Sequence, residues 1–208
     1  MGLNERLGAS TAHRKLTHKE WLQRLDSEDR VKRHRPPLTL RRLGLREKMI
    51  VADLGCGTGF FALPAFEIVG NGGLVVGIDI EPQLLKEMKR KAADKEAVNI
   101  HVICADVSAT PLRSGCVDTS LSACIVCQIP SKEQLFKDLE RIVRKGGSVA
   151  LIEWKMLKTE FGPPLERRIE PSAVIHHLKD LGLRDVSTID LSQTHFGVVA
   201  SKDPPSSN

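Results

Sequence analysis

The chain has 208 residues, of which 41% are hydrophobic, and it carries a formal net charge of +5. This length and apolar content are enough for one well-buried domain. No apolar run approaches the ~18 residues of a membrane span, and the N-terminus lacks the apolar core of a secretory signal, so we expect a soluble, cytoplasmic protein. The five cysteines, an odd number, argue against a disulfide framework.

The basic excess belongs to the N-terminal segment. Residues 1–48 hold 13 Lys and Arg against 6 Asp and Glu, whereas residues 49–208 hold 18 against 20. Such a segment could meet RNA, an anionic small molecule or a membrane surface, or it could be a solvated face without a partner. We expect a helical segment at 1–48 that packs on a core domain at 49–201, followed by a loose tail at 202–208.

The predicted elements begin with two helices. Thr17 and Glu20 resemble a capping box that starts a short helix through Leu25, and Pro36-Pro37 can start a second helix that ends at Gly44. Strands and helices alternate after them. Apolar runs predict five strands at 49–54, 74–80, 100–105, 117–123 and 148–152. Helical spacing predicts helices at 60–69 and 82–97, and one around 135–143 that Gly146-Gly147 closes.

The C-terminal part has a different pattern. A helix is expected from about residue 171, followed by two strands at 184–191 and 194–201. Only a few residues join these strands, so they should pair antiparallel. The strict alternation before them predicts a parallel sheet covered on both faces, wound by right-handed crossovers. The fold class is therefore α/β, a Rossmann-like doubly wound sheet with N-terminal helices.

The stretch VADLGCGTGF at 51–60 follows the first strand. Gly55, Gly57 and Gly59 allow a sharp turn, and a ligand can approach the main-chain N–H groups there, beyond the carboxyl end of the strand. The dinucleotide fingerprint would need a glycine at residue 60, which is Phe60. Asp53 at the strand end would repel a pyrophosphate and attract an ammonium group. The ligand should therefore carry a positive end.

Two further acids end the next strands. Asp79 ends the second strand in Gly-Ile-Asp-Ile, where a carboxylate can accept both hydroxyls of a ribose. Asp106 ends the third strand in Cys-Ala-Asp-Val, where it could accept from an adenine amino group. A single strand-end Asp is more often a turn residue. Three of them in order, beside a glycine-rich turn, indicate a nucleoside ligand.

With these motifs the chain resembles the class I S-adenosylmethionine-dependent methyltransferases, in the group likened to ubiquinone/menaquinone C-methyltransferases. The resemblance rests on the stretches 51–59, 76–80, 105–107, 141–147 and 162–168. It implies the sheet order 3-2-1-4-5-7-6 with the last strand antiparallel, S-adenosyl-L-methionine as cofactor and S-adenosyl-L-homocysteine as product. The cofactor-binding residues that it implies are Asp53, Gly55, Cys56, Gly57 and Gly59 for the methionine part, Asp79 for the ribose, Ile80, Leu84, Asp106 and Val107 for the adenine, and Cys124 near the transferred methyl.

The stretch Ala-Cys-Ile-Val-Cys-Gln-Ile departs from the family pattern, because relatives often have Asn at the position of Cys124 and His at that of Cys127. A Cys-x-x-Cys pair could bind a metal, form a redox pair or accept a thiophilic substrate such as arsenite. Zinc needs four ligands and no second pair has comparable spacing. We therefore expect no metal site and take both cysteines as small buried residues.

Cys127, Arg168 and His195 are the candidate substrate residues. Arg168 lies in the loop after the fifth strand that relatives place over the substrate, and the alternative for it is an exposed ion pair with Glu166. His195 could reach the site from the last hairpin, although a surface histidine is the preferred interpretation. No catalytic residue is assigned, because methyl transfer from a sulfonium needs chiefly alignment.

The sequence thus predicts a methyltransferase for an unidentified small-molecule acceptor. One alternative is an RNA methyltransferase that uses the basic segment, although the chain lacks the Asn/Asp-Pro-Pro-aromatic signature of base N-methylation. Another is a non-catalytic S-adenosylmethionine-binding module. The oligomeric state stays open.

Overall fold

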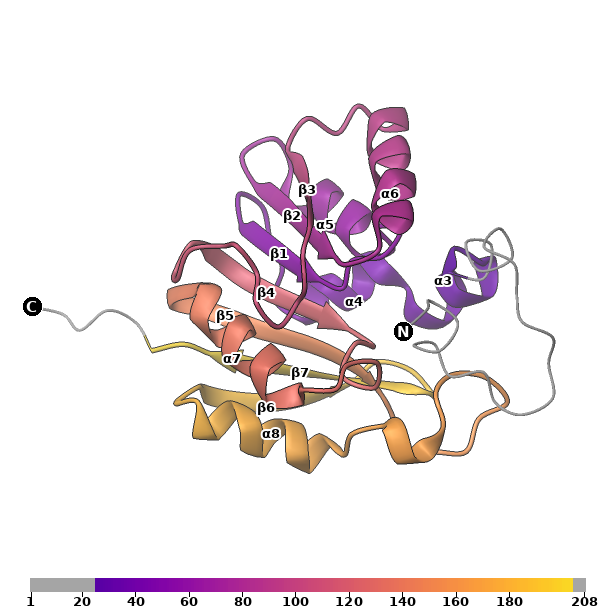
Figure 1. The fold of residues 1–208 in the computed structure, drawn as a ribbon, viewed down its shortest axis with the longest axis vertical. Coiled ribbons are helices and arrows are strands. Elements are labelled where there is room, and N and C mark those ends of the chain that lie inside the picture. Colours follow the sequence, from indigo (N-terminus) through magenta and orange to yellow (C-terminus); the bar gives the residue numbers. More distant parts are fainter. Residues whose placement is uncertain (1–24, 204–208) are drawn as a thin grey trace, which may run out of the picture.

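The computed structural model describes residues 25–203, which form a single seven-stranded sheet with helices on both faces (Figure 1). The strand order is β3-β2-β1-β4-β5-β7-β6. Strands β1 to β5 run parallel, and β7 runs antiparallel to both of its neighbours, β5 and β6. The predicted doubly wound sheet, its order and its antiparallel strand are confirmed. The strands are β1 (Ile50–Leu54), β2 (Leu74–Asp79), β3 (Ile100–Cys104), β4 (Val117–Ala123), β5 (Val143–Trp154), β6 (Arg184–Asp190) and β7 (His195–Ser201).

Helices cover the sheet in two layers. One layer packs on the β1–β3 side, and the other packs over β4, β5, β6 and β7 on the opposite face (Figure 1). The first layer comprises α4 (Pro36–Arg42), α5 (Ala62–Val69) and α6 (Pro82–Asp94), and the second comprises α7 (Lys132–Ile142) and α8 (Pro171–Asp180). A short 3-10 turn, Leu165–Arg167, precedes α8.

Two hydrophobic cores form because successive strand residues point to opposite faces of a sheet. In β1, Val51 packs with α4 and α5, whereas Ala52 and Leu54 pack with the side chains of α7. Both faces of the central strands are therefore buried, which explains their nearly continuous apolar sequences.

Two glycines lie where the sequence did not predict them. Helix α7 ends at Ile142, and Gly146 and Gly147 lie within β5 rather than closing the helix. A Cβ on Gly147 would lie 2.5 Å from the carbonyl oxygen of Asp118, so the close approach of β4 requires a residue without a side chain. The predicted strand at 148–152 is the centre of this longer strand.

The N-terminal helices differ in how well the sequence predicted them. Helix α4 starts at Pro36 as expected, and Gly44 lies just beyond its end. The helix predicted from Thr17 lies largely outside the described residues, as does most of the tail. A helix that was not predicted, α3 (Glu28–His34), begins after Ser27, whose hydroxyl accepts a hydrogen bond from the backbone N–H of Arg30. Between residues 25 and 203, no helix is long and apolar enough to cross a membrane.

Packing of the central strand sets the first prediction. Leu121 in β4 has no exposed surface, whereas Leu157, in the loop after β5, is 51% exposed. Leu121→Ala should lower the free energy of unfolding by about 2–5 kcal/mol, because the substitution leaves a cavity in the core. Leu157→Ala, the matched control, should change it by less than about 0.5 kcal/mol. Urea denaturation followed by circular dichroism measures both, and equal effects would contradict the packing described.

Candidate functional site

A cavity of about 400 Å³ lies beyond the carboxyl ends of the central strands. Residues that end or follow β1, β2, β3, β4 and β5 border it, and α3 borders it from the N-terminal side. Strands β1 and β4 are neighbours there, and their following helices cover opposite faces of the sheet. This is the point where the winding of the sheet reverses, which is the usual ligand site of open α/β sheets. We call it the strand-end cavity.

The glycine loop, residues 55–59, forms the floor of the cavity, and its three glycines have different surroundings. Gly55 has a φ of +83°, and a Cβ there would lie 2.2 Å from Cδ1 of Ile125. A Cβ on Gly57 would meet open space, because this residue borders the cavity. Gly59 does not border it and instead packs against Met88 of α6. A bare backbone is thus needed for packing at two positions and for ligand access at one.

Asp79 fixes the shape of the glycine loop. Its Oδ2 accepts a hydrogen bond from the N–H of Gly57 at 2.9 Å, and its Oδ1 accepts one from the N–H of Glu81 at 3.0 Å. The carboxylate therefore joins the end of β2 to the loop after β1. Each oxygen keeps a second lone pair with which it can accept from a ligand hydroxyl.

Asp53 is a buried acid in the floor of the cavity, and its pKa is raised. The side chain is 2% exposed, and burial raises the pKa of its carboxyl to about 7, with the charge of Asp79 adding to the rise. A cation bound between the two acids would favour the ionised form and offset this cost. The floor of the cavity therefore favours the binding of a positively charged group.

The side of the cavity next to β3 has apolar and polar walls. Leu84 and Val107 are buried and Ile80 is 38% exposed, and all three border the cavity. Asp106 also borders it and accepts hydrogen bonds from the N–H and hydroxyl of Ser108 at 2.8 and 2.6 Å. A flat aromatic ligand would find apolar faces and an acceptor edge here.

The turn after β4, residues 124–128, is held in an unusual backbone conformation. Cys124 has a φ of 58°, and its carbonyl oxygen accepts hydrogen bonds from Nε2 of Gln128 at 2.7 Å and Sγ of Cys127 at 3.4 Å. Glu153, buried at the end of β5, accepts a hydrogen bond from the N–H of Val126 at 3.0 Å. These contacts place both cysteines on the cavity wall.

The two thiols of this turn are protonated at neutral pH. Burial raises the pKa of Cys124 and that of Cys127 well above the ordinary value, and the nearby carboxyl of Glu153 adds to the rise. Within the described part of the chain, no group of three or more His, Cys, Asp or Glu side chains is placed to hold a metal ion.

Arg168 and His195 lie behind the cavity wall rather than in it. Arg168 is 7% exposed and donates to the carbonyl oxygens of Pro163, Lys155 and Leu157 and to Oγ1 of Thr159. The alternative of an exposed ion pair is therefore wrong, because the guanidinium is buried and organises the loop after β5 from inside. That loop presents Phe161 and Pro163 to the cavity.

His195 was expected at the surface, and this is also wrong. The side chain has no exposed surface, and its ring lies 4.2 Å from that of His34 and 4.1 Å from that of Trp154. Burial lowers the pKa of His195 to about 2 and that of His34 to about 3, so both rings are neutral. His195 supports Trp154, which borders the cavity.

The cavity residues that the sequence did not indicate come from α3, from the end of β5 and from the loop after it. The chief ones are Arg30, Arg33 and His34 on α3, and Trp154 and Phe161. A local signal for α3 does exist, since Ser27 followed by two acids is typical of a helix start. No local signal shows that this helix reaches the cavity.

The buried carboxyl of Glu153 makes stability depend on pH. Its pKa rises from the ordinary 4.5 to about 7 through burial, so its stabilising contribution is complete below 4.5 and disappears as pH rises through 7. Between pH 4.5 and 8 the native protein should therefore lose unfolding free energy relative to Glu153→Gln. Denaturant titrations across this range test it, with the exposed Glu166→Gln as control. Parallel curves for the native protein and Glu153→Gln would contradict the assignment.

Comparisons with known proteins agree with this geometry. A family model described as a methyltransferase domain matches residues 45–180. The arsenite methyltransferase of Halobacterium salinarum is 33% identical over 101 residues, which are 49% of this chain and 26% of that protein. The demethylmenaquinone methyltransferase of Lactococcus lactis is 29% identical over 115 residues, 55% of this chain and 46% of that protein. The chain thus spans from about a quarter to about half the length of these relatives.

A solved structure extends the match to nearly the whole chain. The crystal structure of a SAM-dependent methyltransferase from Aquifex aeolicus is 26% identical and superposes with a TM-score of 0.81, covering 89% of this chain and 98% of that one. The family model alone matches more than half of the chain, and it includes the glycine loop and the acids at the carboxyl ends of β1, β2 and β3. The chain therefore belongs to the class I S-adenosylmethionine-dependent methyltransferase family.

Proposed function

We propose that the chain transfers a methyl group from S-adenosylmethionine to a small-molecule acceptor. The observation that carries this proposal is the pair of buried carboxyls, Asp53 and Asp79, beside the glycine loop in the strand-end cavity. A pyrophosphate would meet repulsion at this floor, whereas the ammonium and sulfonium of S-adenosylmethionine would be attracted. The match to the Aquifex aeolicus structure supports the same cofactor.

The residues expected from the sequence give a consistent cofactor site. Asp53, with Gly55, Cys56 and Gly57, would hold the methionine part, and Asp79 would accept from the ribose hydroxyls. Ile80, Leu84, Asp106 and Val107 would surround the adenine, and Cys124 lies at the end of β4 near the reacting methyl. Gly59 would act indirectly, by letting the loop pack on α6. We propose residues 49–201 as the domain that supplies all of these contacts.

The chemistry needs alignment more than acid–base groups. Methyl transfer from a sulfonium is an in-line displacement, and correct positioning can supply about 7–11 kcal/mol of the required stabilisation. The remaining cavity wall is largely apolar and includes Ile125, Ile129, Trp154 and Phe161. This wall fits a small acceptor with an apolar body. The wall would shield this acceptor from water and orient it for transfer.

Two acceptor classes follow from the site and the relatives. The similarity to a demethylmenaquinone methyltransferase, together with the apolar wall, supports a ring-containing acceptor in the ubiquinone/menaquinone group. A thiophilic acceptor is the second candidate, because Cys124 and Cys127 both border the cavity and a relative is named arsenite methyltransferase.

Cys127→Ser should abolish transfer to arsenite and leave transfer to a quinol largely unchanged. This result would separate the two acceptor classes.

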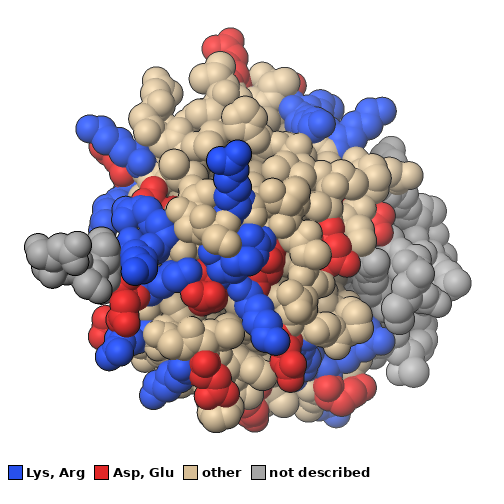
Figure 2. Space-filling view, turned by 60° about the vertical axis from the view of Figure 1, so that its left-hand side comes forward, with Lys and Arg blue, Asp and Glu red and all other residues tan. Residues whose placement is uncertain are grey.

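An RNA acceptor finds no specific support on the face drawn in Figure 2. On the face in Figure 2, acidic side chains lie among the basic ones instead of leaving a continuous basic surface. About half of the basic N-terminal segment lies outside residues 25–203. A labelled methyl group, offered with fractionated metabolites and with RNA, tests all alternatives: label on RNA would overturn the small-molecule proposal, and binding without transfer would favour a non-catalytic module.

Loss of the Asp79 carboxylate should weaken cofactor binding. Asp79→Ala removes the acceptor for the ribose and releases the N–H of Gly57, so affinity for S-adenosylhomocysteine should fall by about 1–3 kcal/mol. Isothermal titration calorimetry measures this loss. Asp180→Ala, which removes an exposed carboxylate at the end of α8, is the matched control and should bind as the native protein does. An unchanged dissociation constant for Asp79→Ala would refute the ribose assignment.

A further inference from the structure

Helix α3 brings the guanidinium of Arg30 to the strand-end cavity. Arg30 borders the cavity, and its guanidinium lies 3.9 Å from the centroid of the Phe60 ring, next to the glycine loop. One N–H of the guanidinium donates to the carbonyl oxygen of Leu25 at 2.6 Å. Among residues 25–203, no Asp or Glu forms an ion pair with it.

This arrangement is costly for the protein alone. Burial lowers the pKa of Arg30, and the charges of Asp26 and Asp53 only partly oppose this effect. A guanidinium has five N–H donors, and Arg30 is partly buried, which makes an incompletely paired charge there unfavourable. An anionic group of a ligand would offset this cost by accepting hydrogen bonds from the guanidinium.

The other basic groups at the cavity are placed differently. Arg33, one turn further along α3, lies over the ring of Phe161 at 4.3 Å, on the side of the loop after β5. His34 is neutral because burial lowers its pKa to about 3. Arg30 is therefore the cation that lies next to the glycine loop, and its charge interacts with Asp53 in the floor.

We propose that Arg30 binds the α-carboxylate of S-adenosylmethionine while Asp53 binds its α-ammonium. This inference rests on the proposed function. The two charges of an amino acid are attached to one carbon atom, so a site for it needs an acid and a base close together. The planar guanidinium matches the two oxygens of a carboxylate with parallel hydrogen bonds. Arg30 supplies the base from α3, and Asp53 supplies the acid from the carboxyl end of β1.

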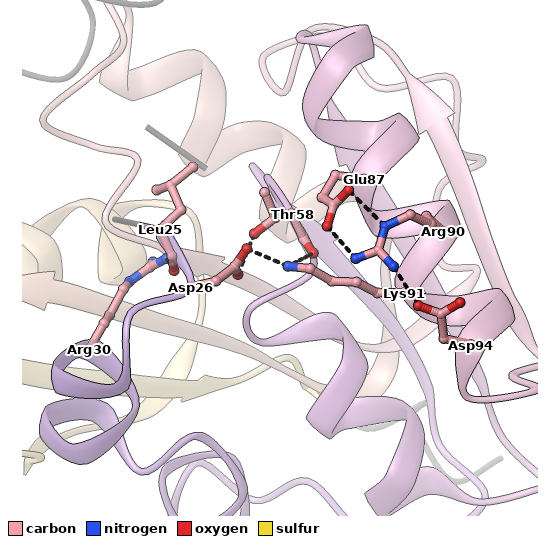
Figure 3. A network of polar contacts seen from close by, with 8 residues as sticks. All are labelled: Leu25, Asp26, Arg30, Thr58, Glu87, Arg90, Lys91 and Asp94. Carbon is pink, nitrogen blue, oxygen red and sulfur yellow. Dashed lines mark hydrogen bonds and ion pairs between the residues drawn. The ribbon is translucent and has the colours of Figure 1, made fainter. Parts of the chain in front are cut away.

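A polar network fixes the segment that carries Arg30 (Figure 3). Asp26, one residue after Leu25, accepts a hydrogen bond from Oγ1 of Thr58 at 2.8 Å and pairs with Nζ of Lys91 at 2.5 Å. Nζ of Lys91 also donates to the carbonyl oxygen of Thr58 at 3.3 Å. The glycine loop, α6 and the start of α3 are thereby joined, so Asp26 is a positioning residue for Arg30.

The contribution of the α-carboxylate to binding can be measured with decarboxylated S-adenosylmethionine, which keeps the sulfonium, the ammonium and the nucleoside. The native protein should bind S-adenosylmethionine more tightly than the decarboxylated compound. Arg30→Gln should bind S-adenosylmethionine roughly 10- to 100-fold more weakly, as expected for a charged hydrogen-bonded pair. Its affinity for the decarboxylated compound should stay unchanged or rise. Calorimetry measures all four constants without turnover.

Control variants separate binding from structure. Arg90→Gln removes an exposed arginine of α6 that pairs with Glu87 and Asp94, and should leave both affinities unchanged. Arg30→Lys keeps the charge and should retain most of the preference for the carboxylate, which also tests the proposal if Arg30→Gln does not fold. Asp26→Asn should weaken S-adenosylmethionine more than the decarboxylated compound, by a smaller factor than Arg30→Gln.

The outcomes that overturn the inference are distinct from failure of the proposed function. If the native protein binds neither compound, the proposed function fails. If it binds both, but Arg30→Gln loses the two affinities equally or loses neither, Arg30 does not bind the carboxylate. If Asp26→Asn loses affinity for the two compounds equally, Asp26 does not position Arg30. The comparison of Arg30→Gln with the native protein then decides the role of Arg30 by itself.

Discussion

The site depends on one hydrogen bond, from the N–H of Gly57 to the carboxylate of Asp79. This bond joins the loop after β1 to the end of β2, and it exists because parallel strands bring their carboxyl ends to one edge of the sheet. It holds the glycine loop open beneath the cavity and places a second acid near the buried Asp53. The raised pKa of Asp53 follows from this closeness and from burial.

The parts that the sequence predicted well are those with local causes. Buried parallel strands have apolar sequences, and the helices between them have helical apolar spacing, so the order of elements could be inferred from the chain alone. The glycines and the acids at strand ends follow from the same reasoning, because the geometry of the sheet brings them together. The order of the strands came from the family resemblance, and the structure has the same order.

The structural features that the sequence did not predict depend on contacts between distant segments. Gly146-Gly147 is a typical helix stop, yet both residues lie within β5, where the carbonyl oxygen of Asp118 in β4 leaves no room for a side chain at Gly147. Arg168 and His195 are typical surface residues, and only the packing of the loop after β5 around Trp154 buries them. Burial of polar side chains is a tertiary property, so no local pattern of residue types predicts it.

The acidic and basic side chains of the cavity lie on different elements, a separation that the net charge of the chain does not reveal. Acids lie in the floor, at the ends of β1 and β2, and arginines lie on α3. Were the two sets in direct contact, they would neutralise one another and the cavity would lose its attraction for a ligand that bears both charges. Contacts of Asp26 with Thr58 and Lys91 fix α3 near the floor, while Phe60 occupies one face of Arg30. Within residues 25–203, opposite charges thus lie close but incompletely paired, an arrangement that favours a zwitterionic ligand.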